Sequence, residues 1–155
     1  MTRSDHDAEY RFAENKEMAF WNDPKSKRQV ANILYADPEG VDWARTPDYD
    51  LVVHGLKYEA KLRWPPHYND VLIETSHSDG NRGWLFHSSA DRLLYLWIEE
   101  DFTIRQFLIY DLKGIQRDWK ILRWMASDVV QSFKNMGRYT TNKVFQLETL
   151  RKYEL

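Results

Sequence analysis

The sequence contains no cysteine. Disulfide bonds, thiolate nucleophiles and cysteine-ligated zinc or iron–sulfur sites are therefore excluded. No apolar run approaches the length of a membrane span, and residues 1–9 are polar and charged, without the apolar stretch of a secretory signal. We therefore expect a cytoplasmic protein that does not enter a membrane.

Several common enzyme motifs are also missing. There is no Gly-x-Ser-x-Gly elbow and no Walker loop, so serine hydrolases and P-loop NTPases fit poorly. The five histidines do not show the i, i+4 spacing of a helical zinc site. Internal repeats and Gly/Ser-rich linkers are absent, and 155 residues are enough for one hydrophobic core. We predict a single domain over residues 1–155.

Charge gives little direct support for nucleic-acid binding. The net charge is −2, whereas phosphate binding usually leaves a basic excess. Carboxylates around a metal site would hide such an excess. Four basic residues recur at three- and four-residue spacing, which on a helix forms one stripe: Lys113, Arg117, Lys120 and Arg123. This stripe is either a track for a phosphate backbone or a solvated helix face.

A predicted hairpin between residues 50 and 64 carries most of the chemistry. Residues 51–53 are apolar, His54-Gly55 can form a two-residue turn, and residues 56–64 alternate between apolar and polar. The same alternation is typical of any half-buried antiparallel strand, whose polar face would simply be solvated. A turn shifted by one residue would also change every pair across the hairpin.

Counting outward from that turn brings two carboxylates together. If Val53 pairs with Leu56, Asp50 lies opposite Glu59, about 5 Å away at Cβ. Lys61 projects from the same face as Glu59, because alternate residues of a strand share a face. Opposed carboxylates repel unless they share a cation, and their oxygens suit Mg²⁺ or Mn²⁺. A lysine beside such an ion can orient water or stabilise developing charge.

These residues resemble the Asp…(Asp/Glu)-x-Lys core of the PD-(D/E)XK nuclease superfamily: Asp50 opens an apolar strand, and Glu59-Ala60-Lys61 follows after a short hairpin. Asp48, in the dipeptide Pro47-Asp48, shares strand parity with Asp50 and is the alternative first ligand. We prefer Asp50, because it directly adjoins the apolar run and has the usual spacing.

Later segments extend the resemblance to roughly residues 10–110. Ile73-Glu74 on a strand, then Gly83-Trp84, then Ala90-Asp91 follow in an order similar to small, often phage-encoded members. Members also draw a glutamate from the first helix toward the metal, and residues 10–21 fit an amphipathic helix. Glu17 matches best, with Glu14 and Glu9 as substitutes. Glu74 is a further candidate, since its strand is expected beside the Glu-x-Lys strand.

The resemblance implies an α/β fold with a central mixed β-sheet flanked by helices, a restriction-endonuclease-like core. It also implies a Mg²⁺-dependent (or Mn²⁺-dependent) deoxyribonuclease. Asp50, Glu59 and the carbonyl of Ala60 would hold the ion, Lys61 would position water, and Glu17 would support the shell. The implied partner is nucleic acid, with DNA favoured by analogy. If a phage encodes the chain, it would act in the host cytoplasm.

Other interpretations stay open. One is a catalytically inactive module of the same fold that binds nucleic acid or a protein partner, such as a phage accessory or inhibitor protein. Another is an interaction protein with an exposed aromatic patch. Endonuclease or exonuclease action, strand preference and oligomeric state, with a homodimer as one option, are not decided by the sequence.

Local patterns predict the remaining elements. Asp23-Pro24 reads as an N-cap and a first-turn proline, so residues 24–34 form a helix, or residues 30–35 a strand. The other expected elements are a turn at 37–40, strands at 92–98 and 103–110, a helix from 112 to about 130, a loop at 137–142 and a short strand or extended tail at 144–150.

Overall fold

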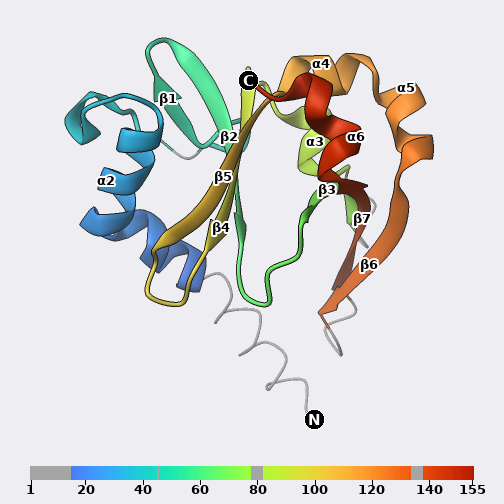
Figure 1. Ribbon diagram of the computed structural model, residues 1–155, viewed down its shortest axis with the longest axis horizontal. Coiled ribbons are helices and arrows are strands. Elements are labelled where there is room, and N and C mark those ends of the chain that lie inside the picture. Colours follow the sequence, from blue (N-terminus) through green and yellow to red (C-terminus); the bar gives the residue numbers. More distant parts are fainter. Residues whose placement is uncertain (1–14, 45, 78–81, 134–137) are drawn as a thin grey trace.

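The strands form two β-sheets that diverge toward the bottom of Figure 1. The computed structural model describes residues 15–44, 46–77, 82–133 and 138–155. The first sheet has the order β1-β2-β4-β5, with β2 and β4 parallel and the other neighbours antiparallel. The second has the order β3-β7-β6 and is antiparallel. The bounds are β1 Leu51–Val53, β2 Leu56–Arg63, β3 Asp70–His77, β4 Arg92–Ile98, β5 Ile104–Asp111, β6 Ser127–Phe133 and β7 Arg138–Gln146.

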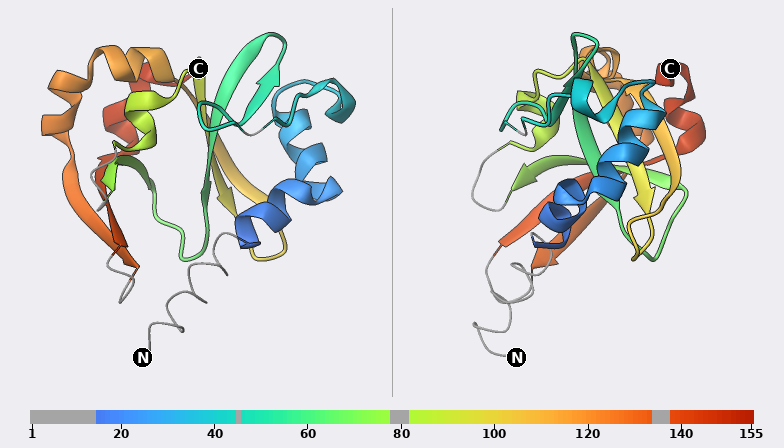
Figure 2. Two further views of the ribbon diagram at one scale, coloured as in Figure 1. Left: turned by 180° about the vertical axis from the view of Figure 1, so that it is seen from behind. Right: turned by 90° about the vertical axis from the view of Figure 1, so that its left-hand side faces the viewer.

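Helices flank the mixed sheet on both faces (Figures 1 and 2). Residues 15–22 are helical and lead into α2, whose N-cap Asp23 accepts a hydrogen bond from the Lys25 amide at 2.8 Å. The bounds are α2 Pro24–Ile33, α3 Trp84–His87, α4 Leu112–Arg117, α5 Trp119–Leu122 and α6 Leu147–Leu150, with 3₁₀ turns η1 Pro38–Gly40, η2 Arg123–Met125 and η3 Arg151–Tyr153. In the described part of the chain, no helix has the length and apolar content needed to cross a membrane.

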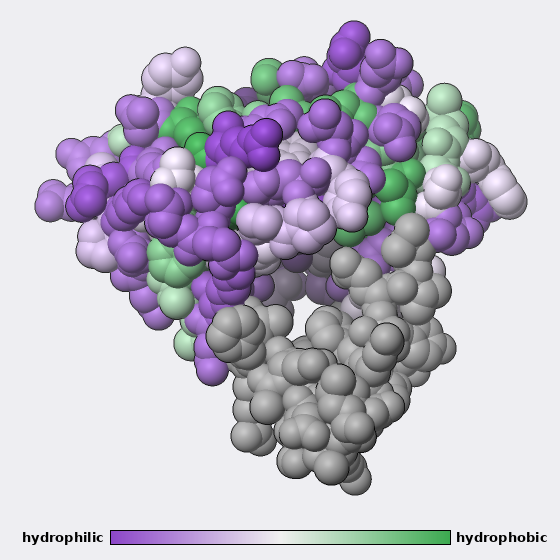
Figure 3. All heavy atoms as spheres, turned by 60° about the horizontal axis from the view of Figure 1, so that its bottom comes forward, coloured by the Kyte–Doolittle hydropathy of each residue, from purple (hydrophilic) through white to green (hydrophobic). Residues whose placement is uncertain are grey.

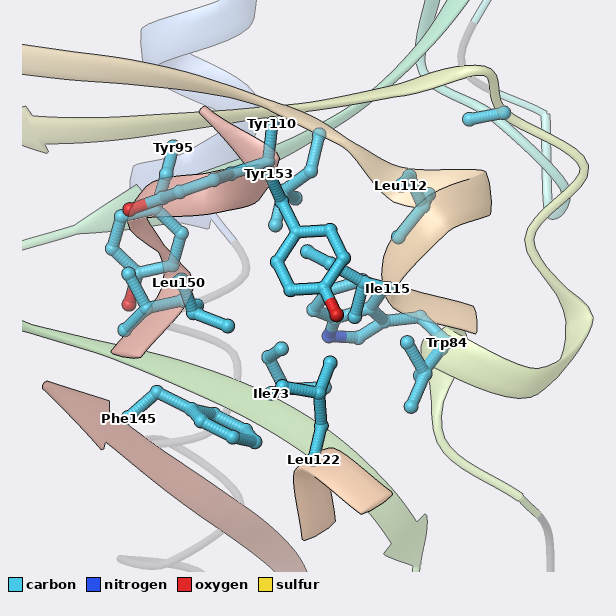
Figure 4. Close-up of a cluster of buried hydrophobic side chains, with 14 of the residues drawn as sticks. Ile73, Trp84, Tyr95, Tyr110, Leu112, Ile115, Leu122, Phe145, Leu150 and Tyr153 are labelled. Atoms are coloured by element: carbon cyan, nitrogen blue, oxygen red, sulfur yellow. The ribbon is translucent and has the colours of Figure 1, made fainter. Parts of the chain in front are cut away.

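Strand β4 separates two hydrophobic cores. It is buried on both faces because it lies between β2 and β5 and is covered from either side. Leu94, Leu96 and Ile98 pack into the core beneath α2. The intervening Leu93, Tyr95 and Trp97 pack into a second core that also receives side chains from β3, β7, α3 and η3 (Figure 4). This second core holds the two sheets together at the top of the molecule.

The sequence predicted the mixed sheet and its helices, but it did not predict the second sheet. Strand β3, which carries Glu74, was expected beside the Glu-x-Lys strand; this was wrong, because β3 pairs with β7. Strand β2 ends at Arg63, just before Pro65 and Pro66, which have no N–H to donate to a ladder. The chain then crosses to the second sheet, and β4 takes the place beside β2.

Two predictions near the C-terminus were also wrong. Helical structure after Leu112 is interrupted at Asp118 and ends at Met125, where the chain enters β6. The predicted loop at 137–142 falls largely within β7, whose described residues begin at Arg138. Turn-forming residues there are overridden by pairing with strands on both sides. The predicted basic stripe is therefore not one continuous helix face. The predicted helix at 24–34 and the strands at 92–98 and 103–110 are confirmed to within a residue or so.

Candidate functional site

The β1–β2 hairpin has the predicted register. Val53 pairs with Leu56 and Leu51 with Tyr58. His54 and Gly55 both have positive φ, at 52° and 78°, as a two-residue type I′ turn requires. The ladder ends at Leu51, and the next amide, of Asp50, donates to the Tyr58 carbonyl at 2.8 Å. Asp50 therefore lies just beyond the paired residues of β1, and the β1–β2 ladder does not include the predicted pairing of Asp50 with Glu59.

Glu59 is the centre of the site. It is only 6% exposed, and both of its carboxylate oxygens have partners. Oε1 lies 3.1 Å from Lys61 Nζ, and Oε2 lies 3.1 Å from Ser88 Oγ. Asp50 is held close by, because its Oδ2 accepts a hydrogen bond from the amide of Ala60, the residue after Glu59, at 2.7 Å. The predicted Asp50, Glu59 and Lys61 thus meet on one face of β2.

Burial raises the pKa of Glu59, since the charged carboxylate is removed from water. The negative charge of Asp50 raises it further, while the nearby Lys61 ammonium and the Ser88 hydroxyl lower it. Desolvation is the largest of these effects, so the Lys61 ammonium does not fully compensate the buried carboxylate. Additional positive charge at this position would stabilise it.

Ser88 was not anticipated from the sequence. It is 8% exposed and sits just after α3, where its Oγ contacts the Asp48 carbonyl oxygen at 3.0 Å as well as Glu59. The Gln116 side-chain amide also holds this residue in place by donating a hydrogen bond to the Ser88 carbonyl at 3.1 Å. No sequence motif marks this serine, because its contacts come from three separate segments. Asp48, the alternative metal ligand, is exposed and takes part through its backbone.

Lys61 is positioned by an aromatic side chain. Its Nζ lies 4.9 Å from the centre of the Trp84 ring, an arrangement that favours a cation over the ring face. The Lys61 side chain remains 32% exposed, so it faces solvent as well as Glu59. Trp84 begins α3 directly after Gly83, whose amide donates to the Thr75 carbonyl of β3 at 2.9 Å.

Gly83 is therefore required for close packing of α3 on β3. A Cβ at this position would overlap the Glu74 carbonyl and lie 2.7 Å from the Thr75 amide nitrogen. We expect Gly83→Ala to lower the free energy of unfolding by about 1–3 kcal/mol, measured by denaturant titration. The matched control is Gly40→Ala, because a Cβ at Gly40 meets nothing within 4 Å. Equal denaturation midpoints for the two variants would contradict this packing role.

A cleft of about 730 Å³ opens beside Lys61, between the two sheets. The space-filling view shows the lower face of the molecule, whose described residues are mostly hydrophilic and which is hollowed near its centre (Figure 3). Arg63 links the two sheets within the cleft: it donates to Asp70 at 2.6 Å and to the Tyr95 hydroxyl at 3.3 Å. The Leu72 amide donates to the same hydroxyl at 3.2 Å.

Two of the four glutamates predicted to assist the site line the cleft beside Lys61. Glu17, on the helical segment 15–22, lines the cleft together with Lys61, and its role beside the metal ligands stays a prediction. Glu74 lines the same cleft, although it comes from the second sheet. Glu14 and Glu9 lie outside the described residues.

The predicted ligand groups can be compared with the coordination that a divalent metal ion requires. Among the described residues no group of three or more His, Cys, Asp or Glu could hold a metal, so no third side chain of these types joins the predicted ligands Asp50 and Glu59 in such a group. The Ala60 amide points toward Asp50, and because the N–H and C=O of one strand residue face the same neighbour, the Ala60 carbonyl faces that edge too. Two carboxylates and a carbonyl fit Mg²⁺, which usually retains several waters.

Comparison with protein-family models, curated proteins and solved structures finds nothing that matches the chain.

Proposed function

We propose that the chain is a Mg²⁺- or Mn²⁺-dependent deoxyribonuclease of the PD-(D/E)XK type. One observation carries the proposal: the buried Glu59 carboxylate lies close to Asp50 and 3.1 Å from Lys61 Nζ, and Lys61 in turn lines a cleft of about 730 Å³. A purely solvated strand face would leave Glu59 exposed, whereas it is 6% exposed. Buried carboxylates with perturbed pKa values beside a cleft are typical of functional sites.

Asp50, Glu59 and the carbonyl of Ala60 would hold the ion. When bound, the ion supplies a Lewis acid for a phosphoryl oxygen and lowers the pKa of a water ligand. Lys61 would hold the attacking water or a phosphate oxygen by hydrogen bonding, so that the water oxygen approaches phosphorus opposite the leaving oxygen. The new P–O bond forms as the bond to the leaving oxygen breaks.

The cleft is lined by charges of both signs, and its carboxylates are those of Glu17, Asp70 and Glu74. Lys61 and Arg63 both project into it from β2. Glu17 lines the same cleft and would support the metal shell. DNA rather than RNA is proposed by analogy alone.

The proposal predicts cleavage that depends on a divalent ion. Purified protein incubated with labelled DNA should produce fragments in Mg²⁺ or Mn²⁺, and excess EDTA should abolish them because the Lewis acid is removed. Supercoiled plasmid and end-labelled linear strands distinguish internal cuts from stepwise removal of nucleotides. Calcium is the control ion, since its larger, looser coordination shell differs from the octahedral shell of Mg²⁺. Binding without cleavage in every ion would instead favour the inactive nucleic-acid-binding module.

A further inference from the structure

A second cavity, of about 350 Å³, lies on the other side of α3 from the cleft. It has two aromatic side chains, one amide and one hydroxyl in its lining, and its size is that of a small-molecule site. The lining residues are Leu85, Phe86, Ser88, Gln116 and Trp119. Ser88 belongs to both sites, because its Oγ lies 3.1 Å from the Glu59 carboxylate.

Phe86 and Trp119 form an aromatic corner in this cavity. Their ring centres are 6.2 Å apart and the rings are nearly perpendicular, at 86°. Phe86 is 42% exposed although it is apolar, so its packing against Trp119 leaves part of the ring open to a ligand. Flat rings of this kind stack on nucleobases regardless of base identity.

Gln116 provides the polar group. Its amide nitrogen donates to two carbonyl oxygens, of Leu85 at 2.8 Å and of Ser88 at 3.1 Å. Both amide hydrogens are thus used, and the side chain is held in one orientation. The amide oxygen is left as an acceptor, which can bond to an amino group of adenine, cytosine or guanine or to the N3–H of an unpaired thymine.

The rim of the cavity carries positive charge. The Arg82 guanidinium lies 5.5 Å from the Phe86 ring centre, and Arg82 is exposed. Lys120, which adjoins Trp119 in the chain, is exposed as well, whereas the exposed Arg117 is already paired with Asp118 at 3.1 Å. A phosphate attached to a base in this cavity would therefore meet cations at the rim.

We propose that this cavity binds an unpaired nucleobase of the substrate strand. The inference rests on the proposed nuclease function and adds a substrate class to it: a strand whose base next to the cleaved phosphate is not paired. Ser88 gives the link, since one residue lines the base cavity and contacts the Glu59 carboxylate.

Binding in EDTA tests this inference without requiring catalysis. Fluorescence anisotropy with labelled (dA)₈, (dC)₈ and (dT)₈ should show binding of each strand, because every base has a face that can stack on an aromatic ring. Phe86→Ala should weaken binding of these strands about 5- to 100-fold, the effect of losing one stacking platform. Phe86→Trp should restore it. The matched control is Phe107→Ala, since Phe107 is 43% exposed on β5, away from the cavity.

The outcomes separate the two proposals. Equal affinity of Phe86→Ala and Phe107→Ala, with both variants folded by circular dichroism, would overturn the base cavity while metal-dependent cleavage by the wild type still upheld the nuclease. Selective loss in Phe86→Ala without any cleavage by the wild type would uphold the base cavity and remove the nuclease. Competition by dAMP as strong as by (dA)₈ would show that the cavity binds a free nucleotide. This would overturn the proposal that it binds a base of a nucleic-acid strand.

Discussion

Lys61→Met should remove metal-dependent cleavage almost completely, lowering its rate about 10²- to 10⁴-fold. The substitution keeps an unbranched chain of similar length over the Trp84 ring, so the packing of α3 is expected to persist. What disappears is the ammonium 3.1 Å from the Glu59 carboxylate, and with it the donor that holds the water or phosphate oxygen. The measurement is single-turnover cleavage of labelled DNA at saturating protein.

Lys57→Met is the matched control for this prediction. Lys57 lies on the same strand and the same face, but its Nζ sits 4.9 Å from the Tyr49 ring centre and not at Glu59. Cleavage by this variant should remain near the wild-type rate, and both variants should show wild-type circular dichroism. If Lys61→Met and Lys57→Met cleave DNA equally well, the lysine has no role in the reaction.

The hairpin could be predicted because its determinants are local. A His-Gly turn with two positive φ values fixes the loop length, and strict alternation over residues 56–63 then fixes which side chains share a face. Asp50, Glu59 and Lys61 follow from counting alone. The hydrogen bond from the Ala60 amide to the Asp50 carboxylate could not be predicted by counting residues from the turn. It replaces a regular ladder bond just beyond the end of β1.

The position of β3 could not be predicted, because strand partners depend on contacts distant in the sequence. Residues 70–77 carry an apolar and polar pattern that would suit either sheet. Their partner β7 begins more than sixty residues later, in a segment whose Thr and Asn residues indicate a loop. Glu74 nevertheless reaches the same cleft as Lys61, since the second sheet forms the opposite wall.

The burial of Glu59 also lay beyond sequence reasoning. Charged residues that alternate along a strand usually indicate a solvated face. Here α3 covers that face, because Gly83 allows it to pack against β3 and brings Trp84 and Ser88 over β2. The residues that bury Glu59 are 84–88, which lie about twenty-five positions after it in the sequence. An isolated Glu-x-Lys pattern cannot reveal it.

Glu59→Gln is expected to separate activity from stability. Loss of a charged ligand should lower Mg²⁺-dependent cleavage at least about 100-fold, since the Lewis acid contributes several kcal/mol. In EDTA, however, the variant should unfold at a higher temperature than the wild type at neutral pH. The new amide can donate to Ser88 Oγ, whose own hydrogen can go to the Asp48 carbonyl, so the buried polar atoms stay paired.

The stability difference should depend on pH in a defined direction. Because burial raises the pKa of Glu59 in the folded protein, folding favours the protonated carboxyl. Its contribution to stability is fully present below the ordinary pKa of a glutamate and is lost as the pH rises through the raised pKa. Glutamine imitates the protonated form at every pH. The melting temperature of Glu59→Gln should therefore exceed that of the wild type increasingly as the pH rises from about 4 to 7.

Thermal unfolding in EDTA across that range, followed by circular dichroism, measures the difference directly. Glu39→Gln serves as the control, because Glu39 is exposed and its substitution should leave the difference from wild type small and flat with pH. A Glu59→Gln variant that melts below the wild type at pH 7 would mean that the Lys61 and Ser88 contacts outweigh desolvation of the carboxylate. Retained cleavage in the same variant would remove Glu59 from the metal site, whatever its effect on stability.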